Sequence, residues 1–324
     1  MSRVNPKTVN HQISDENSRI DEVIYNLGRE FGRSILLIDR FGSNPLSEAF
    51  DNLACPALSL SLDDPIFEDE PTRAPLIIEL RQDIPCHIDL LEKSVELALE
   101  QSVHGYQAPQ ICAWLYTTAS LERMQSEMRK KLDVCYPGGK RIYFRFFDPR
   151  VMHHLARIFP HVDFENGQQS SFSELLGAIQ IWCQISRAGT PMLFRSNNAR
   201  GISKIKGLRI DKRTADAIDR IALVNRVVKE LALMGKACRQ DDDHSIDGMV
   251  LDSEKFGIID VEDKVAYAWR AWFYKKEFTQ QPDLKSRIEK ALSQGLPLEI
   301  EFEDQFPPFS IVDGDEKSLG HAGK

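Results

Sequence analysis

The chain has 324 residues, of which 42% are hydrophobic and 28% charged, and its formal net charge is −8. This length is long for one hydrophobic core and the composition is that of a globular protein, so we expect two domains and exclude a disordered or fibrous chain. The acidic balance, without a long basic tract, argues against nucleic acid as a partner, and no run of about 18 apolar residues is present to cross a membrane.

The polar amino end has no apolar run of the kind that a signal peptide needs, so we expect a cytoplasmic protein. Residues 20–31 carry apolar side chains at helical spacing, and the continuous apolar run over 34–39 is typical of a buried strand. We further expect helices over 46–53, 91–99 and 121–132, and strands over 57–62, 76–80, 111–116, 141–147 and 180–185. This alternation predicts an α/β fold with a mixed β-sheet and flanking helices for an amino-terminal domain, residues 1–200.

The pattern changes after this domain. Glycine, proline and asparagine interrupt residues 188–213, where we place the domain boundary. Helices are predicted over 218–234, 265–273 and 282–293, and a short strand over 296–302. The second half is therefore predicted to be a mainly α-helical lobe, residues 201–312, followed by a disordered tail, residues 313–324.

Common catalytic and cofactor motifs are missing from the sequence. It has no phosphate-binding loop, no dinucleotide fingerprint, no nucleophile elbow and no zinc-protease motif. His153 and His154 are adjacent and so would point in different directions from a helix, which argues against a metal site. We predict no cofactor, no metal ion and no catalytic residue.

One acidic segment resembles a calcium-binding loop in its spacing. Asp243, Asp247 and Glu254 fall at the first, fifth and twelfth positions of such a loop, and Gly248 falls at the sixth. Against this assignment, apolar Leu251 stands at a position that is usually polar, and the sequence has no second calcium-binding loop to pair with this one. We favour an acidic loop between helices and leave calcium binding open.

Three aromatic residues near the carboxyl end are candidates for binding a partner. One face of the helix predicted over 265–273 carries Trp269, Trp272 and Phe273. Aromatic side chains of this kind dominate the energetics of protein interfaces. The same stripe is typical of the buried face of an amphipathic helix, so both interpretations stay open.

The stretch RIYFRFFDPRVMHHLARIF, residues 141–159, places charges among bulky apolar residues. Asp148 is where a helix takes its N-cap, and Pro149 is where the first helical turn tolerates a missing N–H. Arg145 on a buried strand would need a carboxylate or carbonyl partner, because an unpaired desolvated guanidinium costs several kcal/mol. An anion site using Arg145 and Arg150 is disfavoured because Asp148 would repel an anion, so we favour a structural role for these charges.

The string FRFFDPRVM within this stretch closely resembles the F-R-F-[YF]-D-P-R-V-[LM] signature of the bacterial type VI secretion effector adaptor, or chaperone, family. The resemblance extends over residues 30–190. It implies a non-enzymatic cytoplasmic protein that binds a cognate toxic effector and promotes its loading onto the spike protein VgrG. It assigns membership of the signature, and no catalytic role, to Phe144, Arg145, Phe146, Asp148, Pro149 and Arg150.

An enzyme is the competing hypothesis. Its catalytic residues would be scattered in sequence, with Arg145, Asp148 and a distant cysteine or histidine brought together by the fold. This hypothesis predicts a deep pocket at the strand-to-helix turn, lined by a titratable residue with a perturbed pKa.

Overall fold

A computed structural model describes residues 12–13, 19–103, 107–159, 170–196 and 207–308. The chain divides into two compact units, residues 1–218 and 219–324, and the boundary between them falls within helix α7 (Lys212–Leu233). The predicted boundary between residues 200 and 201 and the predicted tail 313–324 lie outside the described residues.

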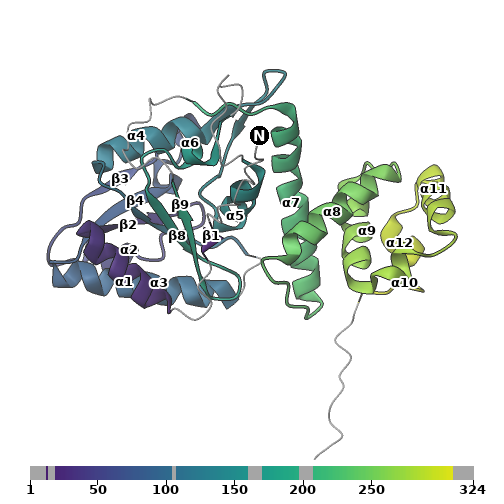
Figure 1. The fold of residues 1–324 in the computed structure, drawn as a ribbon, viewed down its shortest axis with the longest axis horizontal. Helices are drawn as coiled ribbons and strands as arrows, with labels where there is room; N and C mark the ends of the chain where they lie inside the picture. The colour runs from purple at the N-terminus through teal and green to yellow at the C-terminus, as the bar shows by residue number, and fades with distance from the viewer. Residues whose placement is uncertain (1–11, 14–18, 104–106, 160–169, 197–206, 309–324) are drawn as a thin grey trace, which may run out of the picture. The chain divides into compact units, whose positions relative to one another are not determined.

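The amino-terminal unit is built on a seven-stranded sheet with the order β1-β9-β8-β5-β2-β4-β3 (Figure 1). The predicted class, a sheet with flanking helices followed by a mainly helical part, is confirmed. Every pair of neighbouring strands in the described residues is antiparallel, where a mixed sheet was expected. The hydrophobic pattern of a strand shows which of its faces are buried but not the direction in which it runs. It therefore could not distinguish an antiparallel sheet from a mixed one. The strands are β1 (Gln12–Ile13), β2 (Arg33–Ile38), β3 (Ser59–Ser61), β4 (Leu76–Arg81), β5 (Ile111–Tyr116), β8 (Ile181–Ile185) and β9 (Pro191–Arg195), with a separate hairpin of β6 (Asp133–Cys135) and β7 (Arg141–Tyr143).

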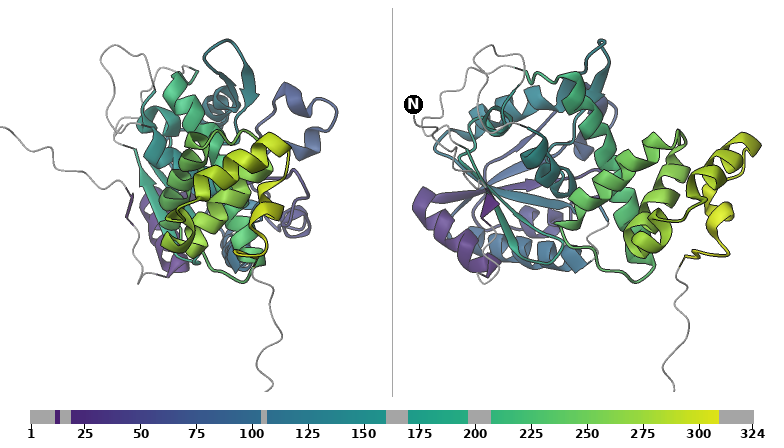
Figure 2. Two further views of the ribbon diagram at one scale, coloured as in Figure 1. Left: turned by 90° about the vertical axis from the view of Figure 1, so that its right-hand side faces the viewer. Right: turned by 45° about the vertical axis from the view of Figure 1, so that its right-hand side comes forward.

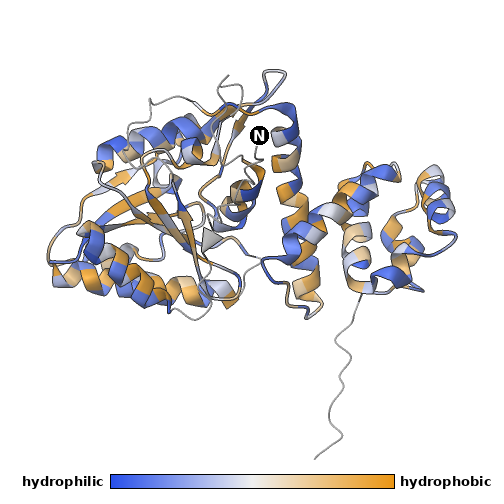
Figure 3. Ribbon diagram, in the orientation of Figure 1, coloured by the Kyte–Doolittle hydropathy of each residue, from blue (hydrophilic) through white to orange (hydrophobic). Residues whose placement is uncertain are grey.

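One face of the sheet is covered by helices α1 (Ile20–Phe31) and α3 (Pro85–Val103) (Figures 1 and 2). Apolar side chains of both helices join those of β2, β4, β5 and β8 in a single buried cluster. The strands are hydrophobic along most of their length, whereas the helices that cover them alternate hydrophobic and hydrophilic residues (Figure 3). This alternation is expected of helices with one face on a core and one face in water.

The other face of the sheet carries α4 (Leu121–Leu132), α5 (Pro149–Ile158) and α6 (Phe172–Leu176) (Figure 1). Strand β8 shows how the two faces are divided. Ile181 and Cys183 belong to the cluster under α1 and α3, whereas the intervening side chain of Trp182 packs against Phe146, 6.2 Å between ring centroids. Gln184, on the same face as Trp182, donates to the backbone carbonyl of Pro149 at 3.0 Å and so ties α5 to the sheet.

The carboxyl-terminal unit is helical. It contains the main part of α7, then α8 (Asp242–Lys255), α9 (Val261–Tyr274), α10 (Lys276–Thr279), α11 (Leu284–Gln294) and α12 (Leu298–Phe302). The strand expected over 296–302 was wrong, because this segment forms α12. Leu298 and Phe302 are both completely buried, and their spacing of four residues places them on one face of a helix.

The centre of this unit contains a fully buried arginine, Arg270 of α9. Its guanidinium donates to the backbone carbonyls of Ala266, Glu299 and Phe306 at 3.0–3.2 Å and to the Glu299 carboxylate at 2.7 Å. It also lies 4.1 Å from the ring centroid of Trp269. A buried charge is tolerated only when it is paired and hydrogen-bonded, and here every contact joins α9 either to itself or to residues 299–306.

None of the helices in the described part of the chain is both long enough and apolar enough to cross a membrane. The predicted cytoplasmic location stays a prediction.

Candidate functional site

The signature string forms a tight junction between β7 and α5. Strand β7 ends at Tyr143, four residues earlier than predicted, because the chain turns at Phe144. The Phe146 amide donates to the Phe144 carbonyl at 2.9 Å, and the Asp148 amide donates to the Arg145 carbonyl at 3.1 Å. The alternation of Ile142 to Phe147 therefore does not continue as a strand. The aromatic side chains of Phe144, Phe146 and Phe147 are all buried by the turn.

Asp148 caps α5, as the sequence predicts. Its carboxylate accepts from the Arg150 amide at 2.9 Å, and it also receives the Arg150 side chain at 2.8 Å. Pro149 occupies the first helical turn, where its missing N–H costs nothing. Burial alone would lower the pKa of Arg150, but the hydrogen bond and the charge of Asp148 outweigh it and raise that pKa above its usual value.

Arg145 finds the carboxylate partner that its position requires. It forms a short ion pair with Asp39, the residue that follows β2, and it lies 3.7 Å from the Asp148 carboxylate. Asp39 also accepts from the Phe41 amide at 3.0 Å. The guanidinium carbon lies 5.9 Å from the ring centroid of Phe41 and 5.8 Å from that of Phe147. The two arginines and two carboxylates of the junction therefore neutralise one another.

Cys112 is the distant cysteine that the fold brings toward this junction. Burial raises the pKa of its thiol well above the usual value, and the charges of Asp39 and Asp148 raise it further. A thiol held in its neutral form is a poor nucleophile, because the thiolate is the reactive species. The arrangement thus disfavours a cysteine nucleophile at this place.

A pocket opens beside the junction, and the enzyme hypothesis stays a prediction. Its volume is about 510 Å³, and its lining includes Asp39, Phe41, Glu100 and Arg145 but not Asp148. This volume is within the range of ligand sites.

The predicted aromatic patch is largely part of a core. Trp269 is 3% exposed and packs with α7 and α8, whereas Trp272 and Phe273 are partly buried against the same cluster. The side chain of Trp269 therefore offers almost no surface to a partner. A role of Trp272 and Phe273 in partner binding stays a prediction.

The acidic segment 243–254 is not a loop. It lies within helix α8, so the expected interhelical loop was wrong. Residues at the first, fifth and twelfth positions of a loop can converge on an ion only when the backbone wraps around it. In a straight helix the side chains of Asp243 and Glu254 are about 16 Å apart along the axis, so the calcium-loop arrangement is not formed.

A buried lysine on α4 was not identified from the sequence. Lys131 is 4% exposed, and its ammonium group has no hydrogen-bond partner among the described residues. Burial lowers the pKa of Lys131 to about 8, against the opposing attraction of Glu127 and Glu174. A methyl group at Gly177 would stand 2.4 Å from the ammonium nitrogen, and the φ of +62° at this position also favours glycine. Lys131 follows Met124 and Met128 on the buried side of α4, and this helical spacing was the available signal.

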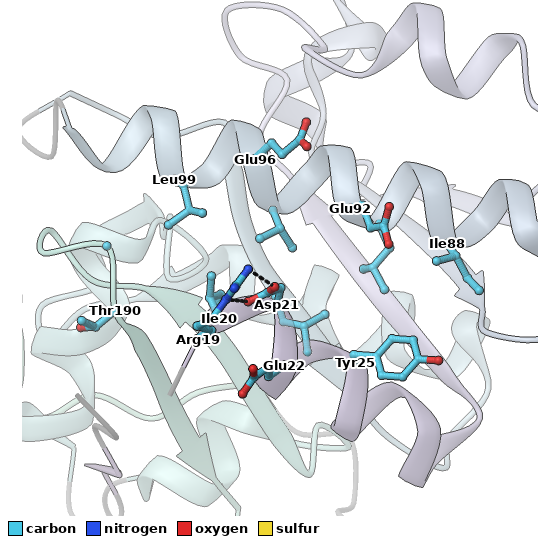
Figure 4. Close-up of a pocket in the computed structure, with 14 residues that line it drawn as sticks. Arg19, Ile20, Asp21, Glu22, Tyr25, Ile88, Glu92, Glu96, Leu99 and Thr190 are labelled. Carbon is cyan, nitrogen blue, oxygen red and sulfur yellow. Dashed lines mark hydrogen bonds and ion pairs between the residues drawn. The ribbon is translucent and has the colours of Figure 1, made fainter. Parts of the chain in front are cut away.

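A second pocket lies between α1 and α3 and is about 740 Å³ in volume (Figure 4). We call it the α1–α3 groove. It is lined by Arg19, Ile20, Asp21, Glu22, Ile24, Tyr25, Ile88, Leu91, Glu92, Val95, Glu96, Leu99, Gly189 and Thr190. The groove forms because two helices lie side by side, although their residues are about 70 positions apart in sequence. No local sequence pattern could therefore predict it.

Comparison with known proteins adds one finding to this geometry. Residues 36–163 match a family model described as a domain of unknown function, DUF4123. The matched range begins in β2 and includes Asp39, the β7–α5 junction and the whole FRFFDPRVM string. Searches among well-characterised proteins and among solved structures gave no significant match.

Proposed function

We propose that the protein is a type VI secretion effector adaptor, which binds a cognate toxic effector and promotes its loading onto the spike protein VgrG. The observation that carries this proposal is the FRFFDPRVM string lying inside the range that matches DUF4123, a domain known in effector-adaptor contexts of type VI secretion. The proposed adaptor works in the cytoplasm, without a cofactor and without catalysis.

The junction geometry supports a scaffold role for the signature. Arg145, Asp148 and Arg150 are engaged with one another, with Asp39 and with the first turn of α5. If one of these charged side chains turned toward a ligand, its present ion-pair partner would be left buried without a counter-charge. Such an unpaired buried charge costs several kcal/mol. In this proposal the signature fixes the fold, and other surfaces bind the effector and VgrG.

The test is direct binding to the products of neighbouring genes. The tagged full chain is co-expressed with the effector encoded beside it and, separately, with the adjacent VgrG. An effector from an unrelated gene cluster is the matched control. We expect retention of the neighbouring effector, of VgrG or of both, and no retention of the control. Recovery of neither neighbouring protein would remove the adaptor function.

The alternative, an enzyme using the pocket beside Arg145, is favoured by one observation, the 510 Å³ volume lined by Asp39 and Arg145. Such an enzyme would bind a small molecule there. A thermal-shift screen against a panel of metabolites tests it, since a bound ligand raises the melting temperature by mass action. A panel that produces no shift at millimolar concentration argues against the enzyme.

A further inference from the structure

The α1–α3 groove combines a buried apolar floor with exposed apolar edges. Ile24, Leu91 and Val95 form the floor and are 1%, 5% and 6% exposed. Tyr25 on α1 and Leu99 on α3 stand at the edges and are 46% and 36% exposed. The floor is already buried in the core, so the exposed apolar surface of the groove comes from Tyr25 and Leu99 at its edges.

The charged residues of the groove are mostly acidic. Four of the five charged lining residues, Asp21, Glu22, Glu92 and Glu96, are negative, and Arg19 is positive, which leaves a net charge of −3. Arg19 pairs with Asp21 at 2.8 Å and lies between α1 and α3 (Figure 4). No cation among the described residues forms an ion pair with Glu92 or Glu96. These two glutamates are four residues apart on α3, where like charges repel.

We propose that the α1–α3 groove binds an amphipathic helix of a protein partner, with an apolar stripe flanked on both sides by lysine or arginine. Lining residues 88–99 of α3 span about 16 Å, which is about three helical turns. An apolar stripe at i, i+3 or i+4, and i+7 would pack between the exposed side chains of Tyr25 and Leu99, in the manner of helix-in-groove recognition. Basic residues on one side would meet Glu92 and Glu96, and those on the other side would meet Glu22.

The acidic edges select the class of occupant. A net negative groove repels nucleic acid and anionic lipid surfaces, and it attracts a basic protein segment. The proposed function is needed only to name the protein that contains the bound helix, which we take to be the effector or VgrG.

The first test uses a fluorescent peptide of about 15 residues with leucines at helical spacing flanked by lysines, and a scrambled peptide of the same composition. Anisotropy is measured with the full chain. We expect the patterned peptide to bind more tightly than the scrambled one. The E92K/E96K variant should bind it at least about tenfold more weakly, since two exposed attractions become repulsions. Leu99→Asp should weaken binding by a similar factor.

The matched control is E68K/D69K, which makes the same change of charge at two exposed positions outside the groove. This control should bind the patterned peptide as tightly as the unmodified chain does. All the variants should have the same melting temperature as the unmodified chain. Equal binding of patterned and scrambled peptides, or equal loss in the control, would overturn the proposal. Tighter peptide binding by R3E/K7E would also overturn it, because the chain's own amino-terminal segment would then be the occupant.

The second test repeats the co-expression experiment with these variants. Loss of the effector or VgrG with E92K/E96K, but not with E68K/D69K, supports the groove as the binding site. Unchanged retention with E92K/E96K and Leu99→Asp overturns the groove and leaves the adaptor function standing. If the unmodified chain binds the patterned peptide but neither protein, the adaptor function fails and the groove remains a site for basic helices.

Discussion

Replacing the buried lysine of α4 should make the protein more stable at neutral pH. We expect Lys131→Met to raise the free energy of unfolding, because methionine fills a similar volume and carries no charge to desolvate. Glu127, which attracts Lys131, would not be left alone. It accepts from the Ala178 amide at 2.7 Å and from Arg123 at 3.1 Å.

The magnitude follows from the lowered pKa of Lys131. One pKa unit corresponds to about 1.4 kcal/mol, so a fall from 10.5 to about 8 represents a cost of about 3 kcal/mol for the charged form in the folded state. Because the folded-state pKa lies below the unfolded-state value, the unfolded chain binds more protons between pH 8 and about 10.5. Stability should therefore rise with pH across this window, and the full cost should be present below pH 8.

The assay is urea unfolding of both proteins at pH 7, 8, 9 and 10, with the difference taken at each pH so that other titrating groups cancel. Lys131→Met should be about 3 kcal/mol more stable at pH 7, and this advantage should shrink toward pH 10. Lys130→Met, at the exposed neighbouring position, is the control and should change stability by less than about 0.5 kcal/mol. A difference that stays constant from pH 7 to pH 10, or a variant less stable at every pH, would refute the reasoning.

Four further substitutions test the assignments made above. Asp148→Ala should cost more than the roughly 1 kcal/mol of a simple N-cap, about 2–3 kcal/mol by urea unfolding, because Arg150 also loses its partner; a cost under 1 kcal/mol would mean that the cap acts alone. Arg145→Ala should cost about 2 kcal/mol, because Asp39 is left buried without its counter-charge, and should leave effector binding intact in the co-expression assay; unchanged melting with lost effector binding would contradict the architectural role. Trp269→Ala should cost about 3–5 kcal/mol and Trp272→Ala clearly less, as measured by thermal unfolding, because only the first is fully packed in the core; equal effects would contradict that distinction.

Local signals in the sequence were sufficient for the helix side of the junction. Asp148 as the N-cap and Pro149 in the first turn are start signals that act within one turn of helix, so the start of α5 could be predicted. The requirement that Arg145 have a partner could also be predicted from desolvation alone. The identity of that partner could not, because Asp39 lies 106 residues away in sequence.

The misassigned segments share one cause. FRFF and LEIEF are too short for their periods to be distinguished, since a run of about five residues fits both an alternating strand and one turn of helix. Packing decided each case. The turn at Phe144 buries three aromatic rings, and Leu298 with Phe302 buries one helical face. The pocket beside Arg145 and the α1–α3 groove were beyond prediction because each is formed by elements that only the tertiary fold brings together.

The buried Arg270 sets a practical limit on how the chain can be shortened. Of its three hydrogen bonds to residues beyond α9, two are accepted by Glu299 and one by Phe306. A fragment that stops before residue 299 would keep α9 but leave a desolvated guanidinium with only the Ala266 carbonyl. Such a fragment should be recovered as insoluble or protease-sensitive material, so the shortest useful expression fragment of the carboxyl-terminal unit must extend past Phe306.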